Sequence, residues 1–116
     1  MTDHARERAL RFLASAEELL ARGDGESALS RAYYAAFTLV FVLLEREGLD
    51  PKTHRGAHSL FARHFVRTGR VDPALGTTLK RAWHAREAVD YAGDRPELDP
   101  KEASQTVAEV ARLVHA

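Results

Sequence analysis

The stretch from Ser30 to Phe37 reads SRAYYAAF and places two tyrosines and an arginine inside an alanine-rich segment. It lies within residues 26–47, where alanines and large aliphatic side chains cover most of the circumference of a helix that turns about 100° per residue. A helix that is apolar on most sides is packed by neighbours on several sides, and its alanines allow those neighbours to approach closely. We therefore predict that this helix lies at the centre of a helical bundle.

The rest of the chain also has helical spacing, with no alternation typical of strands. Further helices are expected over about residues 2–21, 57–68, 73–93 and from 100 onward. Asp72 followed by Pro73 is an aspartate N-cap with proline at the first helical position, and Asp99 followed by Pro100 repeats the pattern. The 116 residues thus predict one domain, residues 1–116, of the all-α class: an up-and-down bundle of four to five helices.

Composition excludes several classes of function. The chain contains no cysteine, which excludes a disulfide framework, a thiolate nucleophile and a zinc–thiolate site. The N-terminus is charged, and the longest apolar run, from Ala35 to Leu44, is shorter than the roughly 20 residues that a bilayer requires. We expect a cytoplasmic protein that does not act at a membrane.

Basic and acidic residues balance at 17 each, but they are unevenly distributed. Between Lys52 and Arg86 there are eight basic residues and only Asp72 as an acid, a charge of +7 that leaves −7 for the remainder. Such a segment can attract phosphates. Its candidate nucleotide- or RNA-binding residues are Arg63, Arg67 and Arg70, which follow i, i+4, i+7 spacing, and Lys80 and Arg81. The alternative is a solvated face whose counter-charges come from elsewhere.

The central helix adds a second group of candidates. Arg31 and Tyr34 share a narrow polar strip, whereas Tyr33 is rotated by about 100° toward the core. In the functional interpretation, Arg31 and Tyr34 border the same cleft as Arg86 and offer a charge and a hydroxyl to a phosphate or a base. In the alternative, the two tyrosines fill the core of the bundle, which we favour for Tyr33.

The SRAYYAAF stretch, together with REAVDY from Arg86 to Tyr91, resembles the HEPN family. This resemblance covers nearly the whole chain. It implies a small all-helical domain of the kind found as RNA-cleaving toxins and as nucleotide-binding partners of minimal nucleotidyltransferases. It also implies a homodimer, in which two copies of the site meet.

Catalytic members of that family pair an arginine with a histidine a few residues later to cleave RNA without metal. Here Arg86 matches the arginine, and Tyr91 stands where the histidine is expected. A phenol with a pKa of about 10 is a poor base at neutral pH. We expect weak or no ribonuclease activity, although Arg86 can still stabilise a phosphate. Alternatively, Arg86 forms an ion pair with Asp90, and Tyr91 packs at the end of the helix.

The histidines give weaker signals. His84 is two residues from Arg86, about 200° away on a helix, so it is not expected to share a surface with that arginine. His54 and His58 have the i, i+4 spacing of a metal site, but His54 is expected in the loop before the helix and no carboxylate lies near in sequence. We predict no metal and no cofactor.

Two functions remain open. The first is a HEPN-like domain that binds RNA or nucleotide, forms a homodimer and partners a minimal nucleotidyltransferase in a toxin–antitoxin-type system. The second is a non-catalytic helical module that docks an acidic protein surface. We expect the homodimer to form around the second and fourth helices, because Phe41 and Leu44 have no other evident place to be buried.

Overall fold

The computed structural model describes residues 3–90 and 100–115, and this part of the chain contains five α-helices and no strand. The helices are α1 (Asp3–Ala21), α2 (Gly25–Arg46), α3 (His54–Phe61), α4 (Pro73–Asp90) and α5 (Pro100–His115). A π-helical turn, η1 (Ala62–Val66), continues α3. The prediction of an all-α bundle is confirmed. The predicted end of the fourth helix at Gly93 and the Asp99 cap lie outside the described residues.

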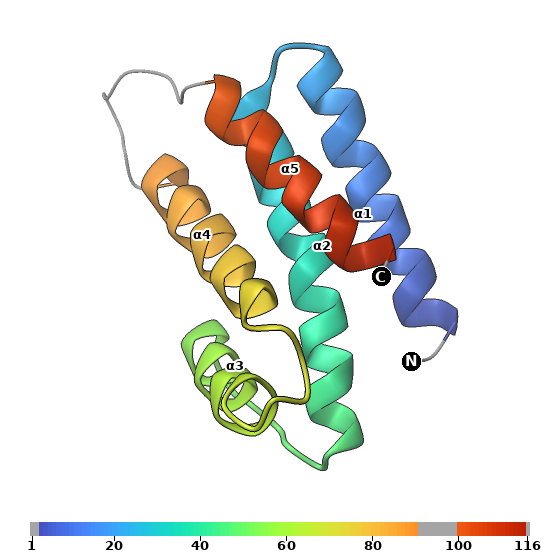
Figure 1. Ribbon diagram of the computed structural model, residues 1–116. Helices are drawn as coiled ribbons and strands as arrows, with labels where there is room; N and C mark the ends of the chain where they lie inside the picture. Colours follow the sequence, from blue (N-terminus) through green and yellow to red (C-terminus); the bar gives the residue numbers. More distant parts are fainter. Residues whose placement is uncertain (1–2, 91–99, 116) are drawn as a thin grey trace.

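Helix α2 is the centre of the bundle, as its apolar circumference predicts. It contacts α1, α5, α4 and α3, and in Figure 1 it lies between α1 on one side and α4 on the other, with α5 crossing in front. Four of its alanines are completely buried, which lets the neighbouring helices approach its backbone: Ala28, Ala32, Ala35 and Ala36.

By length and composition alone, α2 is also long and apolar enough to cross a membrane. Half of its most apolar stretch is buried inside the fold, and it packs against four other helices. The core helix of a bundle has these same properties, so we interpret α2 as a core helix.

Of Phe41 and Leu44, the two apolar residues that were expected to be buried by a second copy, one is already buried in the core of the single chain. Leu44 is 0% exposed within the single chain, so the expectation that it lacks a home is wrong. It packs in the same cluster as Leu39 and Val40 from the preceding turn of α2. Phe41 is half-buried and lines an apolar groove between the start of α1 and the C-terminal half of α2.

Helix α3 begins earlier than the sequence analysis expects. Thr53 is its N-cap, with an extended backbone and a side chain that accepts a hydrogen bond from the Gly56 N–H at 2.9 Å. His54 is therefore the first residue of α3, and its expected place in the loop is wrong. The threonine cap is the physical reason, because it satisfies an N–H group of the first turn that would otherwise lack a partner.

The connection between η1 and α4 is a short turn. Gly69 has a φ of +75°, a left-handed conformation that ends the helical segment. The backbone N–H of Arg70 then donates back to the Phe65 carbonyl at 2.9 Å.

The start of α4 is capped as predicted, because Asp72 accepts a hydrogen bond from the Ala74 N–H at 2.9 Å. A Cβ at Gly76 would lie 3.2 Å from Val66, so η1 and α4 pack closely.

Candidate functional site

A basic pocket of about 320 Å³ opens between the α3–η1 segment and α4. In Figure 1 α3 lies beneath α4, on the same side of α2. The cationic residues that line the pocket are Arg55 from α3, Arg63 from η1, Arg67 just after η1 and Lys80 from α4. We use the name basic pocket for the space enclosed by these four and by Ser59, His58, Trp83, His84 and Glu87.

The four cations of the basic pocket differ from their neighbours in the same basic segment. Among the described residues, none of the four forms an ion pair. Outside the pocket, Lys52 pairs with Asp50 at 2.8 Å, and Arg70 pairs with Glu47 at 2.5 Å. Arg81 pairs with Glu109 of α5. The structure therefore matches the outer cations with carboxylates and leaves the pocket cations open to an anion.

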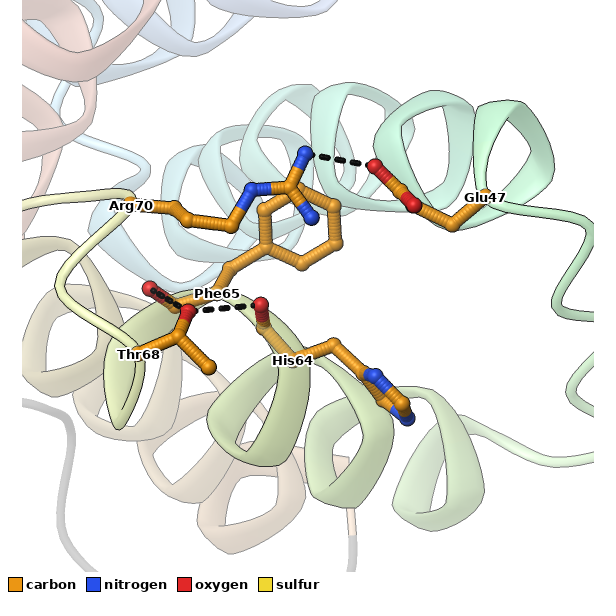
Figure 2. Close-up of polar contacts among 5 residues, drawn as sticks. All are labelled: Glu47, His64, Phe65, Thr68 and Arg70. Atoms are coloured by element: carbon orange, nitrogen blue, oxygen red, sulfur yellow. Dashed lines mark hydrogen bonds and ion pairs between the residues drawn. The ribbon is translucent and has the colours of Figure 1, made fainter.

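Arg70 does not belong to the stripe predicted with Arg63 and Arg67. Figure 2 shows its guanidinium lying over the Phe65 ring and reaching Glu47 at the end of α2. The contact with Glu47 holds the pKa of that carboxyl below its usual value. The i, i+7 spacing fails because the helix ends at Gly69, before Arg70. Thr68 closes this end by donating its hydroxyl to the His64 carbonyl at 2.8 Å (Figure 2).

Lys80 and Arg81 were predicted together, and the structure separates them. Consecutive residues on a helix point about 100° apart. Lys80 lines the basic pocket, whereas Arg81 turns toward α5 and its Glu109. Gln105 of α5 also donates to that carboxylate, at 3.4 Å.

Tyr33 lies next to the basic pocket in a buried cluster with histidines of α3. Its side chain is 0% exposed, which confirms that it belongs to the core. The hydroxyl lies 2.8 Å from Nδ1 of His54 and 2.9 Å from Nε2 of His58. These two contacts link α2 to α3, because the hydrogen-bond partners of the Tyr33 hydroxyl are both histidines of α3.

Aromatic rings complete this Tyr33 cluster, and the Arg86 guanidinium lies against it from outside. His54 stacks between Phe37 at 4.4 Å and Trp83 at 5.1 Å, measured between ring centroids. The Arg86 guanidinium lies 5.0 Å from the centroid of Tyr34 and 5.5 Å from that of Trp83. At these distances the ring faces attract the cation. The predicted closeness of Tyr34 and Arg86 is therefore present.

The cluster disfavours additional charge. Burial, assisted by the neighbouring charges of His54, His84 and Lys80, lowers the pKa of His58 to about 4. Burial and the nearby Arg86 guanidinium also lower the pKa of His54, and burial raises the pKa of Tyr33. At neutral pH both imidazoles and the phenol are neutral.

Neutrality fixes how protons are arranged along the three groups. A hydroxyl has one proton, so Tyr33 donates to one imidazole and accepts an N–H from the other. If Tyr33 donates to His58, His54 carries its proton on Nδ1, and the opposite order requires the opposite tautomers. One extra proton, added to the ring nitrogen that accepts, would make both rings donors and would leave the hydroxyl proton without an acceptor. The cluster is thus built to remain uncharged.

The other predicted site residues are dispersed. Arg31 is exposed on α2 and does not line the basic pocket, and neither do Tyr34 and Arg86, so a cleft shared by Arg31, Tyr34 and Arg86 stays a prediction. Tyr91 lies outside the described residues. His84, which the sequence analysis set apart from Arg86, lines the basic pocket, with its Nδ1 3.8 Å from Glu87.

Sequence reasoning named Arg63, Arg67 and Lys80 but missed the other pocket residues, and a spacing signal for several of these was present. Arg55, Ser59, Arg63 and Arg67 are each four residues apart, and Lys80, His84 and Glu87 follow i, i+4, i+7 on α4. Each set lies on one helix face. Two polar faces of this kind on successive segments would have predicted facing walls of one pocket.

The described residues contain no group of three or more histidine, cysteine, aspartate or glutamate side chains that could hold a metal. The His54 and His58 pair that has metal-site spacing instead holds the Tyr33 hydroxyl. The candidate site is therefore a cationic pocket beside a neutral aromatic cluster, which suits it to bind anions.

Known proteins resemble the chain along most of its length. A UPF0332 protein of Thermotoga maritima is 38% identical over 89 residues, covering 77% of this chain and 67% of the relative. A protein of Methanocaldococcus jannaschii named "Putative toxin MJ0142" is 33% identical over 85 residues, which are 73% of this chain but only 58% of that protein. A UPF0332 protein of Gloeobacter violaceus is 30% identical over 93% of this chain and 86% of its own length.

The match to a family is more extensive. The HEPN domain family matches residues 2–116, which include every helix, the basic pocket and the Tyr33 cluster. The chain therefore belongs to the HEPN family.

Proposed function

We propose that this HEPN domain binds RNA or nucleotide through the phosphates, and that the basic pocket is the binding site. The observation that carries the proposal is the contrast between paired and open cations within residues 52–86. Arg55, Arg63, Arg67 and Lys80 surround one space without a carboxylate partner in the described chain. Arginine and lysine side chains held this way are suited to phosphate oxygens.

The pocket also favours phosphate over the acidic surface of a protein partner. Its cations come from both walls of a concave space, whereas protein carboxylates on a broad surface would be met by a flatter cationic face. The docking of an acidic protein remains the second function, and it predicts that Arg70 and Arg81 contribute as much as the pocket cations do.

Binding without efficient cleavage is part of the proposal. Tyr91 stands at the position of the family histidine, and phenol holds its proton too tightly to act as a base at neutral pH. The imidazoles of His54 and His58 do not replace the family histidine freely, because each has one ring nitrogen engaged by the Tyr33 hydroxyl. The nitrogen is Nδ1 in His54 and Nε2 in His58. Arg86 does not line the basic pocket but lies against the aromatic rings beside it, and its proposed role there is to stabilise a phosphate.

The wider setting is proposed from the family and its relatives. One relative carries the name of a toxin, and the family resemblance implies a homodimer and a minimal nucleotidyltransferase partner. We propose that the chain acts in the cytoplasm in such a toxin–antitoxin-type system. The half-buried Phe41 and the apolar groove beside it support contact with a second copy.

The test compares two double variants with equal loss of charge. Arg67→Gln with Lys80→Gln removes two pocket cations, and Arg70→Gln with Arg81→Gln removes two cations outside the pocket. Filter binding of a short single-stranded RNA is measured across a series of salt concentrations. The pocket variant is expected to lower the slope of log K against log salt by about 1.4, at about 0.7 per phosphate contact.

The control variant is expected to keep the parent slope. Equal slopes for the parent and the pocket variant would refute the proposal, and equal losses in both variants would mean that RNA contacts the whole basic segment, with no preference for the pocket. A gel of the same parent samples is expected to show little or no RNA cleavage.

A further inference from the structure

We propose that the basic pocket binds a terminal phosphate group, the group that ends a nucleoside polyphosphate or a phosphorylated RNA strand, in preference to the phosphodiesters within a strand. The inference rests on the proposed function and names the ligand of the same site. It follows from the shape of the pocket, its net charge and its donors.

The shape comes first. Cations that follow a strand are spread along a track, because each phosphodiester lies one nucleotide further on. Here Arg55 and Arg63 on one wall and Lys80 on the other converge on a single space of about 320 Å³. Close packing of η1 against α4 at Val66 and Gly76 holds the two walls together at one end. A convergent pocket of this kind accommodates the end of a ligand better than the middle of one.

The charge of the pocket points the same way. Four cations and the carboxylate of Glu87 give the pocket a net charge of +3 from its arginine, lysine and glutamate side chains. One phosphodiester within a strand carries a single negative charge, whereas a terminal monophosphate carries about −1.5 to −2 at neutral pH. A terminal diphosphate or triphosphate carries more. Only a terminal group can offset most of the mutual repulsion of the four cations at one position.

The donors match the larger number of oxygen atoms on a terminal group. A terminal phosphate presents three acceptor oxygens, and each arginine can donate two parallel N–H bonds. Ser59 on α3 and His84 on α4 add a hydroxyl and an imidazole at the opening. Both side chains are exposed, so they can meet a ligand without displacing a core contact.

The pocket contains its own probe. Trp83 lines it and is the single tryptophan of the chain, so its fluorescence reports ligands at this site. The experiment titrates the full chain with one RNA sequence made in three forms: with a 5′-triphosphate, a 5′-monophosphate and a 5′-hydroxyl. ATP and inorganic tripolyphosphate are titrated alongside. We expect the triphosphate form to bind at least tenfold more tightly than the hydroxyl form, with the monophosphate between them.

The outcomes separate the inference from the function on which it rests. Equal affinity for the three RNA forms overturns the terminal-phosphate inference and leaves phosphate binding in place. Failure of every RNA and of ATP to bind overturns the proposed function itself. If the terminal group is preferred, ATP binding as tightly as the triphosphate RNA identifies a free nucleotide, and tighter binding of the RNA identifies a strand end.

A matched pair of neighbours locates the effect. Lys80→Gln is expected to weaken binding of the triphosphate form about tenfold, and Arg81→Gln, one residue away but paired with Glu109, is expected to change it less than twofold. Circular dichroism shows whether each variant is folded. A loss in Arg81→Gln equal to that in Lys80→Gln would place the ligand outside the pocket and overturn the inference.

Discussion

The basic pocket and the Tyr33 cluster are neighbours that share His58 and Trp83, yet they treat polar groups in opposite ways. In the pocket, arginine and lysine side chains stay open and charged. In the cluster, a buried hydroxyl and two imidazoles satisfy one another and stay neutral. The positive charge of the pocket at neutral pH therefore comes from arginine and lysine, because His58 belongs electrostatically to the cluster.

This division assigns the two regions different tasks. The cluster joins α2, α3 and α4 through Tyr33, His54 and Trp83, so its residues should affect the free energy of unfolding. The pocket cations make no ion pair in the described chain, so their removal should affect ligand binding and leave stability nearly unchanged. Variants on either side of the boundary test the division.

The largest effect is expected from Tyr33→Phe. The substitution keeps the ring but leaves His54 and His58 without their shared partner. An unsatisfied buried group costs about 1 to 3 kcal/mol, and these half-buried rings should each be near the lower end of that range. We expect the free energy of unfolding to fall by about 2 to 3 kcal/mol in urea titrations. Tyr34→Phe is the control, because the Tyr34 hydroxyl makes no hydrogen bond within the described residues, and its effect should stay below about 0.5 kcal/mol. Equal effects would mean that the bridge contributes nothing special.

A smaller effect is expected from pH. The folded-state pKa of His58, about 4, is below the unfolded value of 6.5, so its contribution to stability is present above pH 6.5 and is lost as pH falls toward 4. The full difference corresponds to about 3 kcal/mol, and partial exposure of the ring reduces this to about 2 kcal/mol. Urea titrations between pH 7 and 4 measure it.

His58→Gln provides the comparison for that titration. Glutamine can donate to or accept from the Tyr33 hydroxyl but does not titrate in this range. The variant should lose less stability than the parent over the same pH interval. An identical pH dependence in the two proteins would show that carboxylates, and not the cluster, control acid unfolding.

The sequence predicted the fold well because the fold depends on local patterns. The apolar circumference of residues 26–47 predicted α2 as the central helix, and Asp72 with Pro73 predicted the start of α4. The errors lie where one residue changes the local geometry. The Thr53 cap moved His54 into α3, and Gly69 ended the helix before Arg70 could join Arg63 and Arg67.

The site was predicted less well because it depends on contacts between distant segments. Counting charges found the basic segment, but it could not separate Lys80 from Arg81, since their difference depends on where Glu109 of α5 lies. The link from Tyr33 to His54 and His58 spans more than twenty residues, and no spacing rule connects α2 with α3. Only the faces of α3–η1 and α4 held a readable signal, in their four-residue spacing.

The smallest effect compares Arg70 with Arg67. Arg70 pairs with Glu47 and lies 4.4 Å from the centroid of the Phe65 ring, two exposed contacts that each contribute little to stability. We expect Arg70→Gln to lower the free energy of unfolding slightly and to leave RNA affinity nearly unchanged. Arg67→Gln should leave the free energy of unfolding nearly unchanged and should lower RNA affinity, because Arg67 makes no ion pair in the described chain and its guanidinium is proposed to contact a phosphate. Urea titration and filter binding on both variants measure the two properties. If both variants lose affinity equally, stability and binding are not divided as the two regions suggest, and the open state of the pocket cations has no functional meaning.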